Sequence, residues 1–193
     1  MILDIRRFLT MKRILLGILV VLALAVPCVF ASDLELELRA IPYLKQKFVN
    51  FESGSAGSSS VQGFGSSAGL KYVFNNGTTA GVEILIDTVS YIEAGNEATF
   101  ADASLMGKVG LATPVDSRIG FELGIAGGID YKCWADQYEF YPTAKINFGF
   151  RFKCSEKTDG VCLNVGALVK LEWNKSVWAD YTLAPYLGLD YKI

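Results

Sequence analysis

The chain has 193 residues with 18 basic and 20 acidic side chains, a formal net charge of −2, and no histidine. A balance this close to neutral offers no basic patch for a nucleic-acid partner, and we expect none. The apolar fraction of 51% is ordinary for a soluble protein. Composition excludes little else, so the pattern of residues has to decide the fold class.

The first 31 residues have the pattern of a secretory signal peptide. The basic pair Lys12 and Arg13 precedes an apolar run at 14–26, and a cleavage site with small residues ends at Ala31. We expect cleavage after Ala31, which leaves residues 32–193 as one domain. That domain carries 14 basic and 19 acidic residues, a net charge of −5.

Two other interpretations of the N-terminal segment are weaker. The apolar run is nearly long enough for an uncleaved anchor helix, but Pro27 and the small residues favour cleavage. A lipoprotein signal ending at Cys28 would normally have a small residue where Pro27 stands. No other segment has the roughly 20 consecutive apolar residues of a membrane helix. Any membrane span in the rest of the chain must therefore be formed by strands.

Apolar and polar side chains alternate in eight segments after residue 32, which predicts an all-β, eight-stranded antiparallel transmembrane β-barrel. The expected strands span residues 34–44, 67–74, 80–91, 100–112, 118–132, 143–153, 161–173 and 183–193. Lipid-facing residues must alternate with lumen-facing residues along each strand of such a barrel. A soluble β-sandwich is the alternative, but it would not place nearly all strand charges on a single face so regularly.

The connections between these segments alternate between short and long. Short turns hold Asn76, Asp116 and Glu156, and Asn75-Asn76-Gly77 is a hairpin signal. The expected long connections are 50–63, 92–99, 133–139 and 174–181. In a bacterial outer-membrane barrel the short turns face the periplasm, so the long connections are expected to face outward from the cell.

The charged residues of the strands fall on the face opposite to the apolar one, which we expect to line the lumen. Eight are basic and nine acidic: Arg39, Lys71, Lys108, Arg118, Lys145, Arg151, Lys170 and Lys192, and Glu35, Glu37, Glu83, Asp87, Asp102, Glu122, Asp130, Glu172 and Asp190. An eight-stranded barrel is only wide enough for its own side chains, so these charges must pair to offset their desolvation. We expect an ion-pair network that fills the lumen, and a gated polar pore is the alternative.

The C-terminal residues carry a resemblance to known barrels. Gly188, Tyr191 and Ile193 are similar to the terminal assembly signal of outer-membrane barrels, although Tyr186 and Ile193 depart from its usual residue types. The topology of residues 32–193 resembles the small eight-stranded barrels of the OmpW and OmpX type, spirochaetal ones included. The resemblance implies a bacterial outer-membrane location, contact with outer-membrane lipid and recognition by the barrel-assembly machinery.

The absence of histidine argues against an enzyme. Barrels of similar architecture that catalyse reactions, such as phospholipases, lipid A modifying enzymes and omptin-type proteases, depend on a histidine as general base. Carboxylate-only chemistry is the alternative, at Glu35 with Glu37 or at Glu83 with Asp87, but these residues fit equally well as lumen partners of lysines. We expect no catalytic residue, cofactor or metal site.

Two prolines and three cysteines are further candidates for a local role. Pro42 and Pro185 lie near the outer ends of the two strands that close the barrel, where a missing N–H weakens the ladder. We expect that the two prolines simply lie at strand ends, and the alternative, which the OmpW resemblance implies, is a lateral seam that releases an apolar ligand into lipid. Cys154 and Cys162 flank a turn and are candidates for a disulfide, which leaves Cys133 over.

Two functions are consistent with this pattern. The first, which we expect, is a narrow, OmpW-like, porin-like conduit for small or apolar molecules. The second is a non-conducting structural or surface-adhesion barrel whose extracellular loops bind a host or envelope partner. Candidate loops are the Gly/Ser-rich segment 53–60 and the aromatic residues Trp134, Tyr138, Phe140 and Tyr141, which could instead anchor at lipid headgroups.

Overall fold

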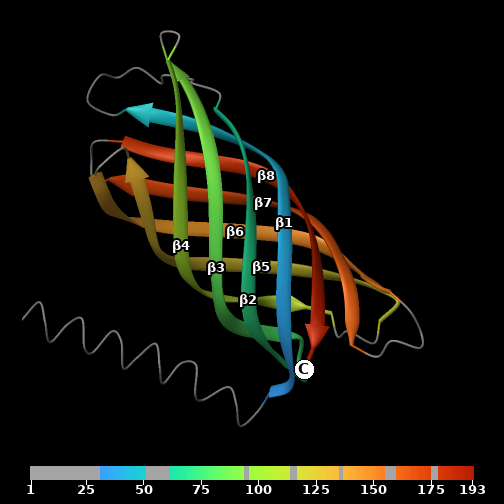
Figure 1. Ribbon diagram of the computed structural model, residues 1–193. Helices are drawn as coiled ribbons and strands as arrows, with labels where there is room; N and C mark the ends of the chain where they lie inside the picture. The colour runs from blue at the N-terminus through green and yellow to red at the C-terminus, as the bar shows by residue number, and fades with distance from the viewer. Residues whose placement is uncertain are drawn as a thin grey trace, which may run out of the picture.

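The computed structural model is a closed barrel of eight antiparallel strands, each paired with its neighbours in the chain (Figure 1). It describes residues 31–50, 61–93, 96–113, 117–134, 137–154, 160–174 and 178–193. The strands are β1 (Ala31–Asn50), β2 (Val61–Phe74), β3 (Thr78–Glu93), β4 (Asn96–Ala112), β5 (Ile119–Trp134), β6 (Gln137–Lys153), β7 (Val161–Asn174) and β8 (Trp178–Lys192). The predicted fold class is confirmed, whereas the expected signal peptide and the segment 53–60 lie outside the described residues.

Closure is made by β1 and β8, which pair from Glu35 with Lys192 to Asn50 with Trp178. A closed barrel leaves no strand edge without hydrogen bonds, as lipid requires, since lipid cannot bond a bare backbone. Among the described residues, no helix is long and apolar enough to cross a membrane.

The strands are longer than the sequence predicted, mainly at one end. The expected loops 92–99, 133–139 and 174–181 mostly continue the strands, so only two residues separate β3 from β4 and β5 from β6, and three separate β7 from β8. The prediction of long connections was wrong in these three places. The polar and aromatic residues of these segments are typical of loops, but the hydrogen-bond ladder between two strands can continue through such residues once it has formed.

The expected hairpin turn at residues 75–77 is confirmed. Gly77 has a φ of +81°, which favours glycine, and its N–H donates to the Phe74 carbonyl at 2.9 Å. The side-chain oxygen of Asn76 accepts from the Thr78 N–H at 3.0 Å. We call the end of the barrel that holds this turn and Ile193 the lower end, and the opposite end the upper end.

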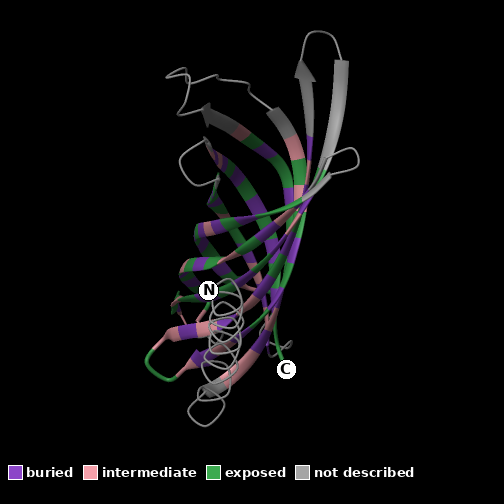
Figure 2. Ribbon diagram, turned by 90° about the vertical axis from the view of Figure 1, so that its left-hand side faces the viewer, coloured by how far each residue is buried: buried purple, intermediate pink, exposed green. Residues whose placement is uncertain are grey.

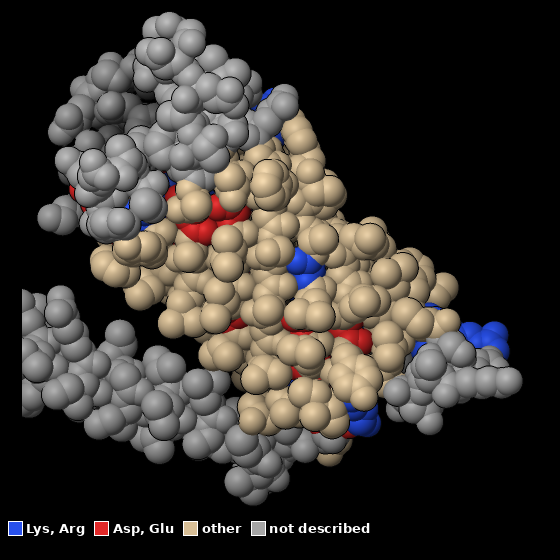
Figure 3. Space-filling model, in the orientation of Figure 1, with Lys and Arg blue, Asp and Glu red and all other residues tan. Residues whose placement is uncertain are grey.

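Burial alternates along the strands, as Figure 2 shows. In β3, Ile84 and Ile86 are each 51% exposed, whereas Glu83, Leu85 and Asp87 between and beside them are at most 4% exposed. Uncharged residues form most of the wall in Figure 3. An apolar belt of this extent suits contact with lipid rather than water, and it leaves the polar residues to fill the interior.

Candidate functional site: the barrel lumen

The lower half of the lumen holds an ion-pair network that we call the lower cluster. Its members are buried side chains from seven strands: Glu35, Glu37, Arg39, Lys71, Glu83, Lys108, Glu122, Lys145, Arg151 and Asp190. They comprise five basic and five acidic residues, so the cluster is neutral as a whole.

Lys71 lies at the centre of the lower cluster. Its Nζ is 2.6 Å from Glu122 and 2.9 Å from Glu37, and it also contacts Glu35 at 3.1 Å and Asp190 at 3.6 Å. These carboxylates come from β1, β5 and β8, so only barrel closure brings them to one lysine. Low dielectric strengthens each contact but also raises the cost of any unpaired charge.

Two arginines extend the lower cluster. Arg39 contacts Glu122 at 2.5 Å and Glu37 at 3.1 Å, and its guanidinium lies 4.7 Å from the ring centre of Tyr186. Arg151 contacts Glu35 at 2.8 Å and binds the Thr113 carbonyl at the lower rim. The network therefore reaches from the rim to the middle of the lumen.

Glycines on β6 and β7 make room for the Tyr186 ring. A Cβ at Gly149 would overlap the Tyr186 hydroxyl and the Asn164 side-chain oxygen, and a Cβ at Gly166 would lie 2.6 Å from the same hydroxyl. At these two positions the absence of a side chain leaves space for an aromatic ring.

An apolar layer lies above the lower cluster. Its inward side chains are Ile41, Leu44, Leu85, Val89, Met106, Ala126, Leu168, Ala184 and Tyr186. Along β3 the order of inward residues is Glu83, Leu85, Asp87, so charge gives way to an apolar residue and then to charge again. The sequence predicted an ionic interior throughout and missed this layer, although all of its residues except Leu44 share the inward parity of their strands.

The upper half of the lumen holds a second network, which we call the upper cluster. Its members are Asp87, Asp102, Asp130, Lys132, Lys170, Glu172 and Asp180. Lys170 contacts Asp87 and Asp130, each at 3.1 Å, and Glu172 at 2.5 Å. The ion pairs of Lys170 stay within this cluster, as those of Lys71 stay within the lower one.

Lys132 is the second lysine of the upper cluster. It lies 3.3 Å from Asp102 and 3.2 Å from Asp180, and it also contacts Glu172. The Gln46 amide donates to Asp180 at 2.7 Å, which ties β1 to this cluster.

The structure places fifteen of the seventeen predicted lumen charges inside the barrel and moves two outside. Arg118 is exposed and precedes the first residue of β5, and Lys192 is exposed at the lower rim, where it pairs with Asp33. The structure adds Lys132 and Asp180. The parity of β5 indicated Lys132, whereas Asp180 lies in the part of β8 that was expected to be loop.

The lumen side chains exclude water from the middle of the barrel. Each strand contributes a polar residue that is at most 8% exposed: Glu37, Lys71, Glu83, Lys108, Glu122, Asn147, Asn164 and Asp190. An open aqueous channel would leave such side chains accessible, because its walls face solvent.

The pairing of β1 is interrupted where Pro42 lies. Pro42 and Tyr43 together oppose the single residue Phe64 of β2, and the pairing with β8 breaks between Ala40 and Lys45. This is a β-bulge, and it switches the inward parity of β1 from odd to even residues. The sequence placed both prolines near the outer strand ends, but the longer strands put them inside β1 and β8.

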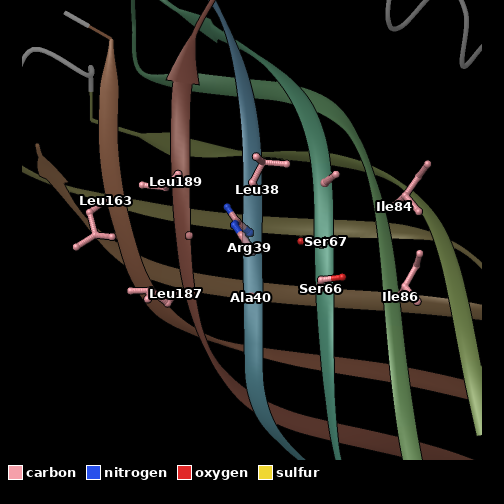
Figure 4. A pocket seen from close by; sticks show the side chains of 12 residues that line it. Leu38, Arg39, Ala40, Ser66, Ser67, Ile84, Ile86, Leu163, Leu187 and Leu189 are labelled. Carbon is pink, nitrogen blue, oxygen red and sulfur yellow. The ribbon is translucent and has the colours of Figure 1, made fainter. Parts of the chain in front are cut away.

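Beside the bulge, an apolar groove of about 670 Å³ crosses the outer wall over β7, β8, β1, β2 and β3. Its lining includes the small residues Ala40, Ser66 and Ala68. Leucines and isoleucines of the flanking strands lie on both sides of Ala40 and Ser66 (Figure 4). Arg39 and Ser67, whose side chains face the lumen, also line it.

The expected disulfide is absent from the structure. Cys162 faces the lumen and pairs with Lys153, whereas Cys154 is exposed and its N–H donates to the Val161 carbonyl at 3.2 Å. Successive side chains point to opposite faces of a strand, so the two sulfurs do not share a face. The side chain of Cys133 lies outside the described residues.

The residues of the expected assembly signal lie on β8 and just beyond it. Tyr191 is 50% exposed on the outer wall, Ile193 is 66% exposed, and Gly188 faces the lumen against Arg39. Recognition by the assembly machinery stays a prediction.

Comparison with known proteins identifies the architecture. No protein-family model matches the chain, and no curated protein matches its sequence. Among solved structures, the Neisserial surface protein A matches with a TM-score of 0.59 at 15% identity, covering 84% of this chain and 99% of that one. The fold is that of the small eight-stranded outer-membrane barrels.

Two other solved structures match less closely. The attachment invasion locus protein Ail of Yersinia pestis, in complex with a heparin analogue, has a TM-score of 0.47 at 12% identity and covers 82% of this chain and 99% of its own. The outer membrane protein OprG of Pseudomonas aeruginosa has a TM-score of 0.43 at 11% identity and covers 85% and 97%.

Proposed function

We propose that the chain is an integral protein of the bacterial outer membrane with a closed lumen and no enzymatic activity. We expect the protein to act through contacts of its outer surface and not by conducting molecules through a channel. The observation that carries this proposal is the burial of the lumen charges: none of the ten members of the lower cluster is more than 8% exposed. A hydrated pore would keep its charged lining in contact with water.

Two barriers in series support the closed lumen. An ion that enters from the lower end meets Lys71 and its four carboxylates, whose contacts must break before the ion can pass. Above them lies the apolar layer, in which Leu85 and Met106 are each 1% exposed. An ion would lose its hydration there without gaining polar partners.

Planar-bilayer recording on the purified protein tests the proposal. We expect no current steps over a wide voltage range, although heat-modifiable migration on a gel shows that the barrel is folded. A general porin inserted in the same bilayer is the positive control. Discrete and reproducible current steps from the folded protein would contradict the closed lumen and favour the conduit.

If the lumen is closed, a host or envelope partner has to bind the outside of the protein. We expect it to bind the upper end, where the strands extend furthest beyond their predicted limits. Bilayer-spanning strands need only about 9–11 residues, whereas β1 has 20 and β4 and β6 each have 17. Bacteria that display the protein are expected to bind such a partner, and replacement of the segment 51–60 by a two-residue Asn-Gly turn tests whether this connection contributes.

A lateral route for an apolar ligand is the second candidate function, because one observation favours it specifically. The bulge at Pro42 interrupts the β1–β8 pairing beside the apolar groove. By contrast, β3 and β4 pair without a shift from Thr78 to Glu93.

Hydrogen exchange separates this candidate from a fully rigid wall. We expect amides of β1 and β8 near Pro42 and Pro185 to exchange faster than amides in the middle of the β3–β4 pair. Equal protection at the two places would remove the lateral route. Because conductance measures the lumen and exchange measures the wall, the two experiments can fail independently.

A further inference from the structure

The charges of the upper cluster are out of balance. The described members comprise five carboxylates and two lysines, a net charge of −3, whereas the lower cluster has five residues of each sign. Burying a net charge is costly unless a counter-charge accompanies it. The upper cluster therefore has a deficit of positive charge within the same barrel that balances it elsewhere.

Three carboxylates of the upper cluster face one another without a shared lysine. Oxygens of Asp102, Asp130 and Glu172 all lie within 4.8 Å of one another. Lys132 contacts Asp102 and Glu172, and Lys170 contacts Asp130 and Glu172, but neither lysine contacts all three. The group comes from β4, β5 and β7, so no spacing in the sequence indicates it.

The lower cluster contains a similar group of three carboxylates and shows the contrast. Oxygens of Glu37, Glu122 and Asp190 also lie within 4.8 Å of one another. Here the ammonium of Lys71 contacts all three, at 2.9, 2.6 and 3.6 Å. The protein thus supplies its own cation at the lower group.

Oxygen atoms without hydrogen bonds point to the same difference. Asp102 Oδ1 and Asp130 Oδ2 are excluded from solvent and make no hydrogen bond, on residues that are 4% and 0% exposed. Asp87 and Asp180 of the upper cluster each have one such oxygen as well, whereas in the lower cluster two nitrogens of Arg39 are also without a hydrogen bond. In the lower cluster, water can bridge such oxygens to such nitrogens. In the upper cluster, water could hydrogen-bond to the oxygens but could not neutralise their negative charge.

We propose that Asp102, Asp130 and Glu172 bind one divalent cation, with Ca²⁺ preferred over Mg²⁺. Ca²⁺ accepts oxygen ligands in flexible geometry at about 2.3–2.6 Å, whereas Mg²⁺ demands a near-ideal octahedron. Three carboxylates that already share two lysines suit the ion with the more tolerant geometry. Because two lysines share the cluster, we expect a Kd of about 10⁻⁴–10⁻³ M, as in extracellular calcium modules.

Terbium luminescence tests the site directly, because Tb³⁺ is a hard cation that replaces Ca²⁺ at oxygen ligands. Tyr141 is buried and pairs with Asp130 across the β5–β6 ladder, so it can sensitise a bound Tb³⁺. We expect tyrosine excitation of the purified full-length protein to give Tb³⁺ emission that Ca²⁺ displaces. We also expect Ca²⁺ to raise the unfolding temperature above its value in EDTA by a few degrees.

Matched variants locate the cation. Asp102→Asn is expected to reduce Tb³⁺ emission at least tenfold while keeping, or raising, the unfolding temperature in EDTA, since it removes a surplus charge. Asp190→Asn changes an equally buried carboxylate in the balanced cluster, and Asp33→Asn changes one at the rim. Both should keep the emission, and gel migration identifies any variant that does not fold.

The outcomes separate clearly. Emission that is absent from the native protein, together with an unfolding temperature that EDTA leaves unchanged, overturns the site without any variant. Emission that Asp190→Asn or Asp33→Asn abolishes, but Asp102→Asn does not, also overturns it. None of these results depends on whether the lumen conducts.

Discussion

Lys71 offers the sharpest test of the lower cluster, since one ammonium serves four carboxylates. Each of its contacts, at 2.6–3.6 Å, corresponds to an attraction of roughly 5–6 kcal/mol at an effective dielectric constant of about 20. Desolvation of the ammonium and repulsion from the neighbouring arginines offset most of this attraction. Removing one partner of a buried pair costs about 3–5 kcal/mol, and four partners place Lys71→Met at the upper end of that range.

Urea unfolding of the protein in lipid vesicles, followed by tryptophan fluorescence, measures the change in the free energy of unfolding. Lys192→Met is the matched control, because Lys192 pairs with Asp33 at the rim and its side chain is 42% exposed. An exposed pair contributes about 0–1 kcal/mol. We expect the two Lys→Met changes to differ by at least about 2 kcal/mol.

A double variant separates ion pairing from packing. Lys71→Met with Glu122→Gln removes one charge of each sign and keeps the cluster neutral, so the loss should be smaller than the sum of the two single losses. The reasoning is refuted if Lys71→Met costs no more than Lys192→Met, or if the two losses add without coupling.

Three other predictions follow from the packing and the faces of the strands. Gly149→Ala should cost about 1–3 kcal/mol by overpacking against Tyr186, and Tyr186→Phe should recover part of the loss, both measured by urea unfolding. Ile125→Arg on the apolar belt should cost about 2–4 kcal/mol in bilayers and Ile193→Arg at the lower rim about 0–1, whereas equal costs would contradict the membrane assignment. A polar maleimide should label Cys154 on the folded barrel and leave the buried thiol of the same hairpin unlabelled until unfolding, as mass spectrometry can check.

The sequence alone determined the strand count, the closed antiparallel class and, apart from the part of β1 beyond Pro42, the two faces of each strand. These properties depend on local alternation, because successive side chains of a strand point to opposite faces whatever the rest of the chain does. Glu83 and Ile84 could therefore be assigned to opposite sides of the wall without coordinates. Lys132 and Leu85 share the inward parity of their strands, so local alternation is also sufficient to place both of them in the lumen.

Only the tertiary structure decided which residues meet inside the barrel. Lys71 reaches Glu122, 51 residues away, because barrel closure and the stagger of the strands bring β2 and β5 together. The bulge at Pro42 reverses the parity of β1 above it, and no local pattern indicates that reversal. The division of the lumen into a neutral cluster and an acidic one likewise depends on the relative heights of residues on different strands, which the alternation within each strand leaves open.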